Sequence, residues 1–415
     1  MSRRYKVALL VALYIAQGLP FGFFTGALPI LLRQAGYSLT AISALSLLYL
    51  PWALKFLWAP VVDRIGRRKQ WLLSLQLTSI AAAAVLASID GTEQLALMLI
   101  AAFVFNLIAA TQDIVTDGLA VRMLDNEERG IGNGIQVGAY RIGMILGGGL
   151  LLIVFDRTNW STMFACMALL LALTVIPVLV LREPPEGEST QATPTYLLAG
   201  WLQRLLRPGM LAIIALVFCY RFGDQVISTL WGPFLTDFGL ETQTIALMKG
   251  TVGSLTSLAG AFLGGWFAFA VSRRHALLVS GLAQGACFIL YILAAAGVGG
   301  VAMLWSATIL EGVIGTIATV ALFTFMMDAS DPEHAGTDYT LLASIVVLVG
   351  SIGNVVGAVI ADAFGYLPAF VIGAALSVAG CLTLVWTLDR RPLSSRIEAA
   401  WRGTSALAPA RINAG

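Results

Sequence analysis

Residues 160–182 read WSTMFACMALLLALTVIPVLVLR, with no charged side chain between Trp160 and Arg182. A helix needs about 20 mostly apolar residues to cross the hydrocarbon core of a bilayer. A strand of an outer-membrane barrel would instead alternate apolar and polar residues, which this stretch does not do. The stretch therefore predicts one membrane-spanning helix, and the rest of the chain repeats its character.

The composition of the whole chain agrees with this interpretation. Of the 415 residues, 58% are hydrophobic and only 12% are charged, whereas a soluble domain carries about 25% charged residues. This excludes an ordinary soluble enzyme and a disordered chain. The net charge of +2 gives no electrostatic reason to expect nucleic acid as a partner. The four cysteines all fall inside apolar runs, where core positions are expected rather than disulfides.

The sequence predicts twelve segments of this kind. They span about 7–32, 39–60, 71–90, 95–121, 131–155, 160–182, 210–236, 244–271, 276–297, 300–327, 337–362 and 366–388. Only helices and closed barrels satisfy their own backbone polar groups in lipid. The expected fold class is therefore an all-α membrane protein with twelve transmembrane helices.

Lysine and arginine are distributed unevenly between the predicted loops. The N-terminus, every second loop and the C-terminal tail together carry 19 of the 25 basic residues, and the opposite loops carry only Arg33 and Arg157. Cytoplasmic loops of membrane proteins are enriched in lysine and arginine. Both termini are therefore expected in the cytoplasm, which agrees with an even number of spans.

The chain repeats itself when it is shifted by 206 residues. Residues 125–130 (DNEERG) then fall on 331–336 (DPEHAG), and Gly147 falls on Gly353. We expect an N-terminal six-helix half at 1–182, a cytoplasmic linker at 183–209, a C-terminal six-helix half at 210–388 and a cytoplasmic tail at 389–415. This arrangement resembles the major facilitator superfamily, in which the substrate binds near the bilayer midplane between two such halves.

The loop after the second predicted helix reads DRIGRRK, residues 63–69. It resembles the D-R-x-G-R-R/K loop of the same superfamily, and its glycine permits a tight turn. We expect a gating loop whose basic side chains pair with acidic groups and helix C-termini in one conformational state. The residues concerned are Asp63, Arg64, Gly66, Arg67 and Arg68. The alternative is a basic loop that only sets the orientation in the membrane.

Ionisable residues inside spans are costly, so they are functional candidates. The acidic members, which are candidates for proton coupling, are Asp113, Asp117, Asp224 and Glu311. Asp113 and Asp117 are four residues apart and so share one helix face, and two close, desolvated carboxylates are harder to ionise together. The alternative is a set of ion pairs that only stabilises the bundle, with Lys55 or Arg141 as the partner of Asp113.

Basic, aromatic and amide side chains inside the predicted spans are candidates for substrate binding. They are Lys55, Arg141, Arg221, Tyr140, Gln17, Gln112 and Trp52. Positive groups in a central cavity would attract an anionic substrate. No P-loop, nucleophile–base pair or metal cluster is present in the sequence, so we expect neither an enzyme nor a metal site nor a cofactor.

Several motifs resemble the AmpG-like branch of the superfamily, over about residues 10–388. They are KFLWAP at 55–60, QDIVTD at 112–117, ERG at 128–130, YRIGM at 140–144 and YRFGD at 220–224. This branch contains muropeptide permeases, siderophore permeases of the RhtX/FptX type and acetyl-CoA transporters. The short chain and the segments QGLPFG at 17–22 and GTDYT at 336–340 resemble the siderophore group most.

The resemblance implies a transporter of the bacterial inner membrane that imports a ferric siderophore, such as ferric pyochelin, into the cytoplasm. We expect it to work by alternating access, to be driven by protons and to act as a monomer in the lipid bilayer. The alternative is a muropeptide permease that serves cell-wall recycling. Both substrates carry carboxylates, so the charged residues in the spans do not separate the two.

Overall fold

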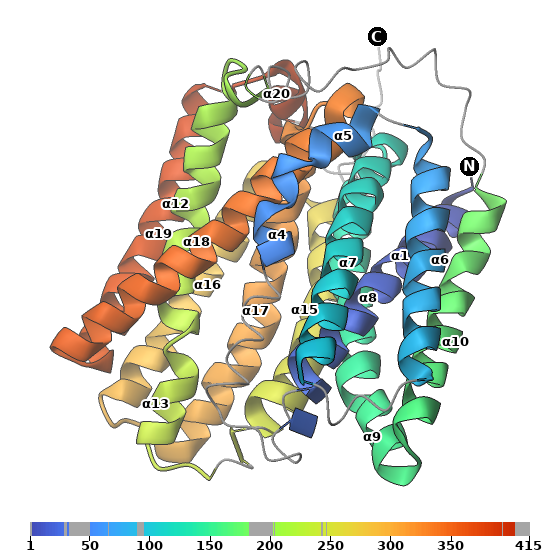
Figure 1. The fold of residues 1–415 in the computed structure, drawn as a ribbon. Coiled ribbons are helices and arrows are strands. Elements are labelled where there is room, and N and C mark those ends of the chain that lie inside the picture. Colours follow the sequence, from blue (N-terminus) through green and yellow to red (C-terminus); the bar gives the residue numbers. More distant parts are fainter. Residues whose placement is uncertain are drawn as a thin grey trace. The chain divides into compact units, whose positions relative to one another are not determined.

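The computed structural model describes residues 2–28, 31–32, 50–64, 66–88, 95–181, 202, 204–241, 244–245, 247–391 and 393–402. Within these ranges the chain is helical and forms no strand (Figure 1). Eleven helices there are long and apolar enough to cross a membrane. The expected all-α membrane fold is therefore confirmed. The predicted span 39–60 falls largely outside the described residues, which begin again at Leu50.

The described helices are numbered in chain order. They are α1 (Arg3–Gly22), α4 (Leu50–Leu54), α5 (Ala59–Arg64), α6 (Arg68–Ala87), α7 (Leu95–Met123), α8 (Arg129–Ile145), α9 (Leu151–Arg157), α10 (Trp160–Val180), α12 (Met210–Ser228), α13 (Trp231–Asp237), α15 (Gly253–Ala270), α16 (Arg273–Ala295), α17 (Gly300–Ala329), α18 (Ala335–Phe364), α19 (Tyr366–Arg390) and α20 (Ser395–Arg402). Short π-helical segments at Phe23–Ala27, Leu146–Leu150 and Leu247–Val252 continue or precede α1, α9 and α15.

Local sequence explains where several helices begin. Asn159 caps α10, since its side chain accepts a hydrogen bond from the Thr162 N–H at 2.9 Å. Gly209 and Gly299 precede α12 and α17 with φ of 87° and 79°, a backbone conformation that favours glycine. The Asn159 cap satisfies one of the first backbone donors of α10, which would otherwise stay without a partner.

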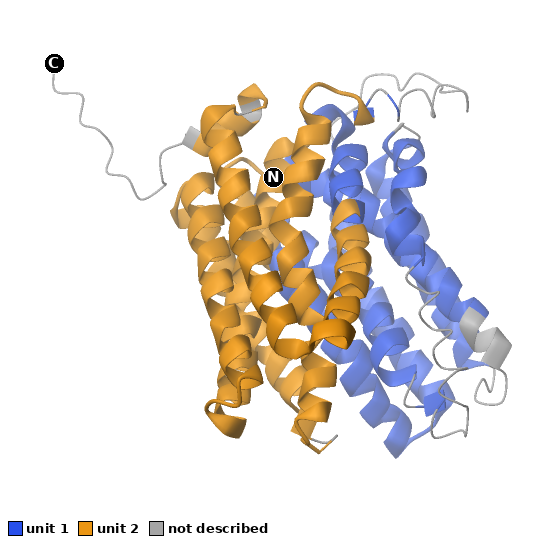
Figure 2. Ribbon diagram, turned by 90° about the vertical axis from the view of Figure 1, so that its left-hand side faces the viewer, with its two compact units in different colours: residues 1–123, 135–204, 331–344 blue, residues 124–134, 205–330, 345–415 orange. Residues whose placement is uncertain are grey.

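Contacts between residues divide the chain into two compact units (Figure 2). Unit 1 contains Met1–Met123, Ile135–Arg204 and Asp331–Ser344, and unit 2 contains Leu124–Gly134, Leu205–Ser330 and Ile345–Gly415. The first turns of α18 therefore belong to unit 1, although they lie in the second repeat of the sequence. The division into two six-helix halves stays a prediction from the repeat.

Glycines bring α1 and α8 into close contact in unit 1. A Cβ atom at Gly18 would lie 2.2 Å from the carbonyl oxygen of Tyr140, and one at Gly147 would lie 1.9 Å from that of Leu19. Aromatic side chains, including Phe23 and Phe164 with ring centroids 5.1 Å apart, fill the core of this unit beyond the glycines. The backbone approach fixes the rotation of α1, which decides which of its side chains face α7.

Unit 2 is built in the same way. α12 packs along α19, and α16 packs along α17 and α19. A Cβ atom at Gly223 would lie 2.2 Å from the Ser377 nitrogen, and one at Gly380 would lie 1.9 Å from the Cys219 carbonyl oxygen. This contact holds the polar face of α12 toward α16 and α17.

Candidate functional site

Two carboxylates on α7 are buried. Asp113 is 6% exposed and Asp117 is 1% exposed. Lys55, in the helical turn Lys55–Leu57 between α4 and α5, is also buried and forms an ion pair with Asp113. Lys55 is thus one of the two partners that the sequence offered for Asp113.

Asp117 receives hydrogen bonds from two other helices of unit 1. The hydroxyl of Tyr14 on α1 donates to Asp117 Oδ1 at 2.8 Å, and Gln136 Nε2 on α8 donates to the same oxygen at 3.2 Å. The hydroxyl of Tyr339 on α18 in turn donates to Gln136 Oε1 at 3.2 Å. Because both donors to Asp117 are neutral, the carboxyl group can change its protonation state without breaking an ion pair. A role for Asp117 in proton coupling stays a prediction.

A group of aromatic side chains lies beside Lys55. The ring centroids of Phe21, Trp52 and Tyr140 lie 5.7 to 6.1 Å apart, and Lys55 Nζ lies 5.4 Å from the Trp52 ring. Trp52 Nε1 donates to Asn106 Oδ1 at 3.1 Å, which fixes the indole. All three rings are half-buried. Aromatic faces with a few fixed polar groups are typical of small-molecule sites.

The predicted amide ligands are buried between α1 and α7. Gln17 is 0% exposed, and its Nε2 donates to Thr116 Oγ1 at 3.0 Å. Gln112 Nε2 donates to the Leu13 carbonyl oxygen at 3.4 Å. These contacts hold the two helices together, and binding of substrate by either amide stays a prediction. Arg141 is half-buried and follows Tyr140 on α8.

A second polar cluster lies within unit 2. Arg221 Nη1 lies 2.5 Å from Asp224 Oδ2, one helical turn further along α12, and 3.3 Å from Thr319 Oγ1 on α17. Gln284 Nε2 on α16 donates to Asp224 Oδ1 at 2.8 Å. Asp224 therefore has a cationic partner, and its role in proton coupling stays a prediction.

Glu311 lies on α17 near the same cluster. Its Oε1 would lie 2.8 Å from a Cβ atom at Gly315, and its charge acts on Lys249, in the π-helical segment Leu247–Val252. Within unit 2 the structure thus brings the predicted acidic residue Glu311 near a lysine from another element. A role for Glu311 in proton coupling stays a prediction.

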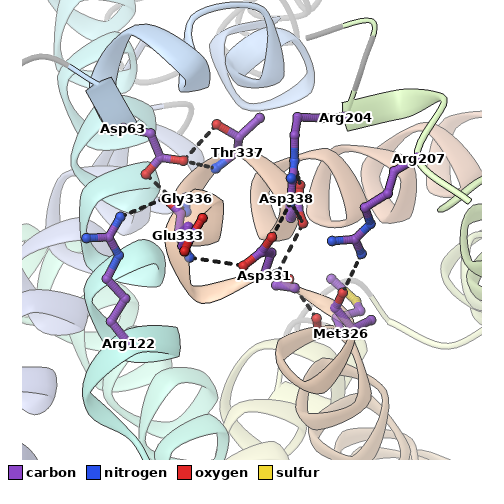
Figure 3. Close-up of polar contacts among 12 residues, drawn as sticks. Asp63, Arg122, Arg204, Arg207, Met326, Asp331, Glu333, Gly336, Thr337 and Asp338 are labelled. Carbon is purple, nitrogen blue, oxygen red and sulfur yellow. Dashed lines mark hydrogen bonds and ion pairs between the residues drawn. The ribbon is translucent and has the colours of Figure 1, made fainter. Parts of the chain in front are cut away.

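The predicted gating loop contacts the start of α18 through its acidic residue (Figure 3). The Asp63 carboxylate accepts hydrogen bonds from the backbone nitrogens of Gly336 at 3.2 Å and Thr337 at 2.5 Å, and from Thr337 Oγ1 at 2.7 Å. Arg68 Nη2 lies 3.2 Å from Asp63 Oδ1. A carboxylate at a helix N-terminus is favourable because it accepts the free backbone donors there. The contact with α18 therefore runs from an acidic side chain to a helix N-terminus. A gating role for the loop and its basic side chains stays a prediction.

The remaining members of the predicted loop shape its turn. Gly66 has φ of +72°, which explains the glycine between α5 and α6. Arg67 precedes α6 and its backbone N–H donates to Gln70 Oε1 at 3.3 Å. The side chain of Arg64 lies outside the described part of the structure.

Arg204, at the end of the predicted linker, holds the start of α18 in unit 1 (Figure 3). Its guanidinium donates to both oxygens of Asp338, at 3.0 and 2.7 Å, and to Asp331 Oδ2 at 3.1 Å. Asp338 is 0% exposed. Burial lowers the pKa of Arg204, but the hydrogen bonds and charges of Asp338 and Asp331 raise it by more. Burial likewise raises the pKa of Asp331, while the Glu333 N–H and Arg204 lower it overall.

In unit 2, Asp328 joins the ends of three helices. Asp328 Oδ1 lies 2.7 Å from Arg129 Nη1 on α8, and its Oδ2 lies 2.7 Å from Arg273 Nε on α16. The carboxylate is 1% exposed. Asp328 and Asp338 are not among the residues predicted from the sequence, because both lie within one residue of a predicted span edge. At such an edge, hydropathy does not separate membrane from loop. The closely spaced charged residues of the motif at 331–338 were the sequence signal that could have identified this region.

Comparisons with known proteins were made over the whole chain. A family model described as Major Facilitator Superfamily matches residues 10–354 and 218–414. The anhydromuropeptide permease of Escherichia coli strain K12 is 30% identical over 390 residues, covering 92% of this chain and 79% of that protein. A Rickettsia felis protein named putative transporter AmpG 4 is 22% identical over 380 residues, covering 85% of this chain and 91% of its own.

A solved structure has a fold similar to that of this chain. The crystal structure of FucP, a Major Facilitator Superfamily transporter in the outward conformation, has a TM-score of 0.73 with 15% sequence identity. The similarity covers 92% of this chain and 99% of that chain. At this identity the likeness bears on the fold alone.

Proposed function

The chain belongs to the Major Facilitator Superfamily, as an AmpG-like multi-pass membrane transporter, and we propose that it imports an anhydromuropeptide across the bacterial inner membrane. The observation that carries the proposal is the 30% identity to the Escherichia coli anhydromuropeptide permease over 92% of this chain. We propose further that transport proceeds by alternating access, is driven by protons and is performed by a monomer with both termini in the cytoplasm.

The comparisons favour this substrate over the ferric siderophore that the sequence analysis placed first. The segments at 17–22 and 336–340, which suggested a siderophore permease, are short. The similarity to the permease named for anhydromuropeptides extends over 390 residues. A ferric siderophore therefore becomes the alternative that the experiment must exclude.

The chemistry of the described residues supports an anionic substrate that also carries sugar rings. An anhydromuropeptide joins sugar rings to a short peptide with free carboxylates. The half-buried rings of Phe21, Trp52 and Tyr140 offer apolar faces for a sugar. In unit 2, Arg221 is 20% exposed at its side chain, and a guanidinium binds carboxylates well through paired hydrogen bonds.

Asp117 is the proposed proton carrier. Its carboxyl group is buried, and its hydrogen-bond donors Tyr14 and Gln136 are neutral. Asp113 is held by Lys55 and is proposed to keep that cation near the carrier. Loading of a proton from the periplasmic side and its release to the cytoplasm would then give import its direction.

Uptake into proteoliposomes tests the proposal. Under an inward proton gradient, labelled anhydromuropeptide should accumulate, a protonophore should stop it, and ferric pyochelin should not enter. Asp117→Asn should abolish gradient-driven accumulation, whereas Glu241→Gln, at an exposed carboxylate outside the predicted spans, should not. Entry of ferric pyochelin alone would refute the substrate, and full accumulation by Asp117→Asn would remove Asp117 from the mechanism.

A further inference from the structure

We propose that Gln136 and Tyr339 are positioning residues that transmit the protonation state of Asp117 to the start of α18. The inference rests on the proposed function, because it assumes that Asp117 gains and loses a proton during transport. It assigns a task to two side chains that bind no substrate in the proposal above. The contacts involved all lie within unit 1.

Along the chain of hydrogen bonds from Tyr339 through Gln136 to Asp117, each side chain donates to the next. Gln136 Nε2 donates to Asp117 Oδ1 at 3.2 Å, and Tyr339 Oη donates to Gln136 Oε1 at 3.2 Å. A charged carboxylate only accepts hydrogen bonds, so it requires the NH₂ end of the Gln136 amide. The carbonyl end is then left for Tyr339, whose hydroxyl must act as the donor.

Protonation of Asp117 weakens this network. Hydrogen bonds to an ionised carboxylate are roughly twice as strong as those between neutral groups, so the bond from Gln136 Nε2 to Asp117 Oδ1 loses strength when the carboxyl becomes neutral. Gln136 is then held less firmly, and its carbonyl oxygen is a less well fixed acceptor for the Tyr339 hydroxyl. The step adds one proton to Asp117, and no covalent bond is broken.

The charged and titratable groups around Asp117 leave this route open. Facing it in the described part of the chain are Asp113 on the same helix, Lys55 from the turn before α5, Tyr14 from α1 and Tyr339 from α18. Lys55 is engaged by Asp113, and Asp113 also forms a side-chain hydrogen bond with Asp117. Asp113 can accept the proton of a neutral Asp117, so Tyr14 and Gln136 keep their places as donors to Oδ1.

The start of α18 is placed to respond to this change. A Cβ atom at Gly118, the residue after Asp117, would lie 3.0 Å from Gly336 Cα, so the two backbones are in contact. Asp63 holds the neighbouring backbone nitrogens of Gly336 and Thr337. Tyr339 is 1% exposed, so a less firmly held acceptor for its buried hydroxyl weakens the packing of this turn.

Amide hydrogen exchange of residues 335–341, without substrate, tests the inference. Exchange is measured between pH 5.5 and 8.5 and corrected for the intrinsic exchange rate. In the parent protein we expect protection of this segment to fall about three- to tenfold on acidification, the size expected when one hydrogen bond changes from charge-assisted to neutral. In Tyr339→Phe and in Gln136→Leu the protection should not change with pH.

Tyr14→Phe is the matched control, because it removes a neutral donor from the same carboxyl oxygen but leaves the path to α18 intact. It should keep the pH-dependent change, with a shifted midpoint. The inference is overturned if the parent protein shows no change, if Tyr339→Phe keeps it, or if Tyr14→Phe loses it. Monodisperse elution in detergent confirms that each variant is folded. If Tyr339→Phe is not folded, Gln136→Leu takes its place in the test.

The two proposals fail separately. If protection changes as expected but no anhydromuropeptide enters proteoliposomes, the positioning role stands and the proposed function is wrong. If anhydromuropeptide enters under a proton gradient but Tyr339→Phe keeps the pH-dependent exchange, the proposed function stands and the positioning role is wrong.

Discussion

Replacing Lys55 by methionine removes the cation from a buried ion pair while keeping most of the side-chain volume. The side chains of Lys55 and Asp113 are 4% and 8% exposed, so the carboxylate left behind has little access to water. Breaking a buried pair from one side costs about 3–5 kcal/mol, because one charge stays buried without a partner. Asp117, four residues further along α7, adds a second carboxylate to the site.

The orphaned group can take up or release a proton, which limits the loss and makes it depend on pH. Protonating an aspartate of ordinary pKa 3.9 costs about 1.36 kcal/mol for each pH unit above that value, or about 4 kcal/mol at pH 7 and about 1.5 kcal/mol at pH 5. In Lys55→Met the folded protein then binds more protons than the unfolded chain, so its stability falls as the pH rises.

The reverse variant has the opposite dependence. Asp113→Asn leaves a buried lysine, whose deprotonation from an ordinary pKa of 10.4 costs about 4.6 kcal/mol at pH 7 and about 2 kcal/mol at pH 9. The stability deficit of Asp113→Asn should therefore shrink as the pH rises, and that of Lys55→Met should shrink as the pH falls. The double variant Lys55→Met/Asp113→Leu should recover most of the loss, because it leaves no buried charge.

Thermal unfolding in detergent at pH 5, 7 and 9 measures these differences. The matched control is Arg274→Met, which breaks the exposed ion pair with Asp389, where the side chains are 37% and 34% exposed. Its loss should stay below about 1 kcal/mol. Two results would refute the argument that Lys55 and Asp113 form a buried charge pair. One is that the stability of both single variants changes with pH in the same direction. The other is that Arg274→Met loses as much stability as they do.

Three further predictions concern the packing and the contacts of α18. Gly147→Ala should cost about 1–3 kcal/mol in thermal unfolding, because its Cβ would lie 1.9 Å from a carbonyl oxygen, whereas Gly149→Ala meets nothing within 4 Å and should be neutral. Arg204→Gln should lower the free energy of unfolding by about 3 kcal/mol. Arg204 helps to lower the pKa of Asp331 from 3.8. The stabilisation contributed by the Asp331 carboxylate is therefore present above about pH 4 and is lost as the pH falls through the lowered pKa. The stability difference between the two proteins measured from pH 7 to 3 should therefore narrow only at the acidic end. Asp63→Ala should increase hydrogen exchange of residues 336–337 at least tenfold at pH 7, and equal exchange would contradict the capping role.

The membrane class, the spans and the candidate residues could be predicted from the sequence. The span predicted at 160–182 was placed by hydropathy alone, and α10 runs over Trp160–Val180. Asp113 and Asp117 were selected because a charge within an apolar run is costly wherever the helix packs. The glycine of the DRIGRRK loop was also predictable, and Gly66 does adopt a positive φ of 72°.

The tertiary structure decided which candidate residues contact one another. Lys55 and Asp113 are 58 residues apart, Tyr14 and Asp117 are 103 apart, and Arg204 and Asp338 are 134 apart. The physical reason is that a span is a property of one stretch of chain, because the bilayer thickness fixes its length and the cost of its charges. A partner depends on how each helix is rotated against its neighbours. That rotation is set by close contacts such as Gly18 against Tyr140 and Gly118 against Gly336, which the pattern of a single helix does not contain.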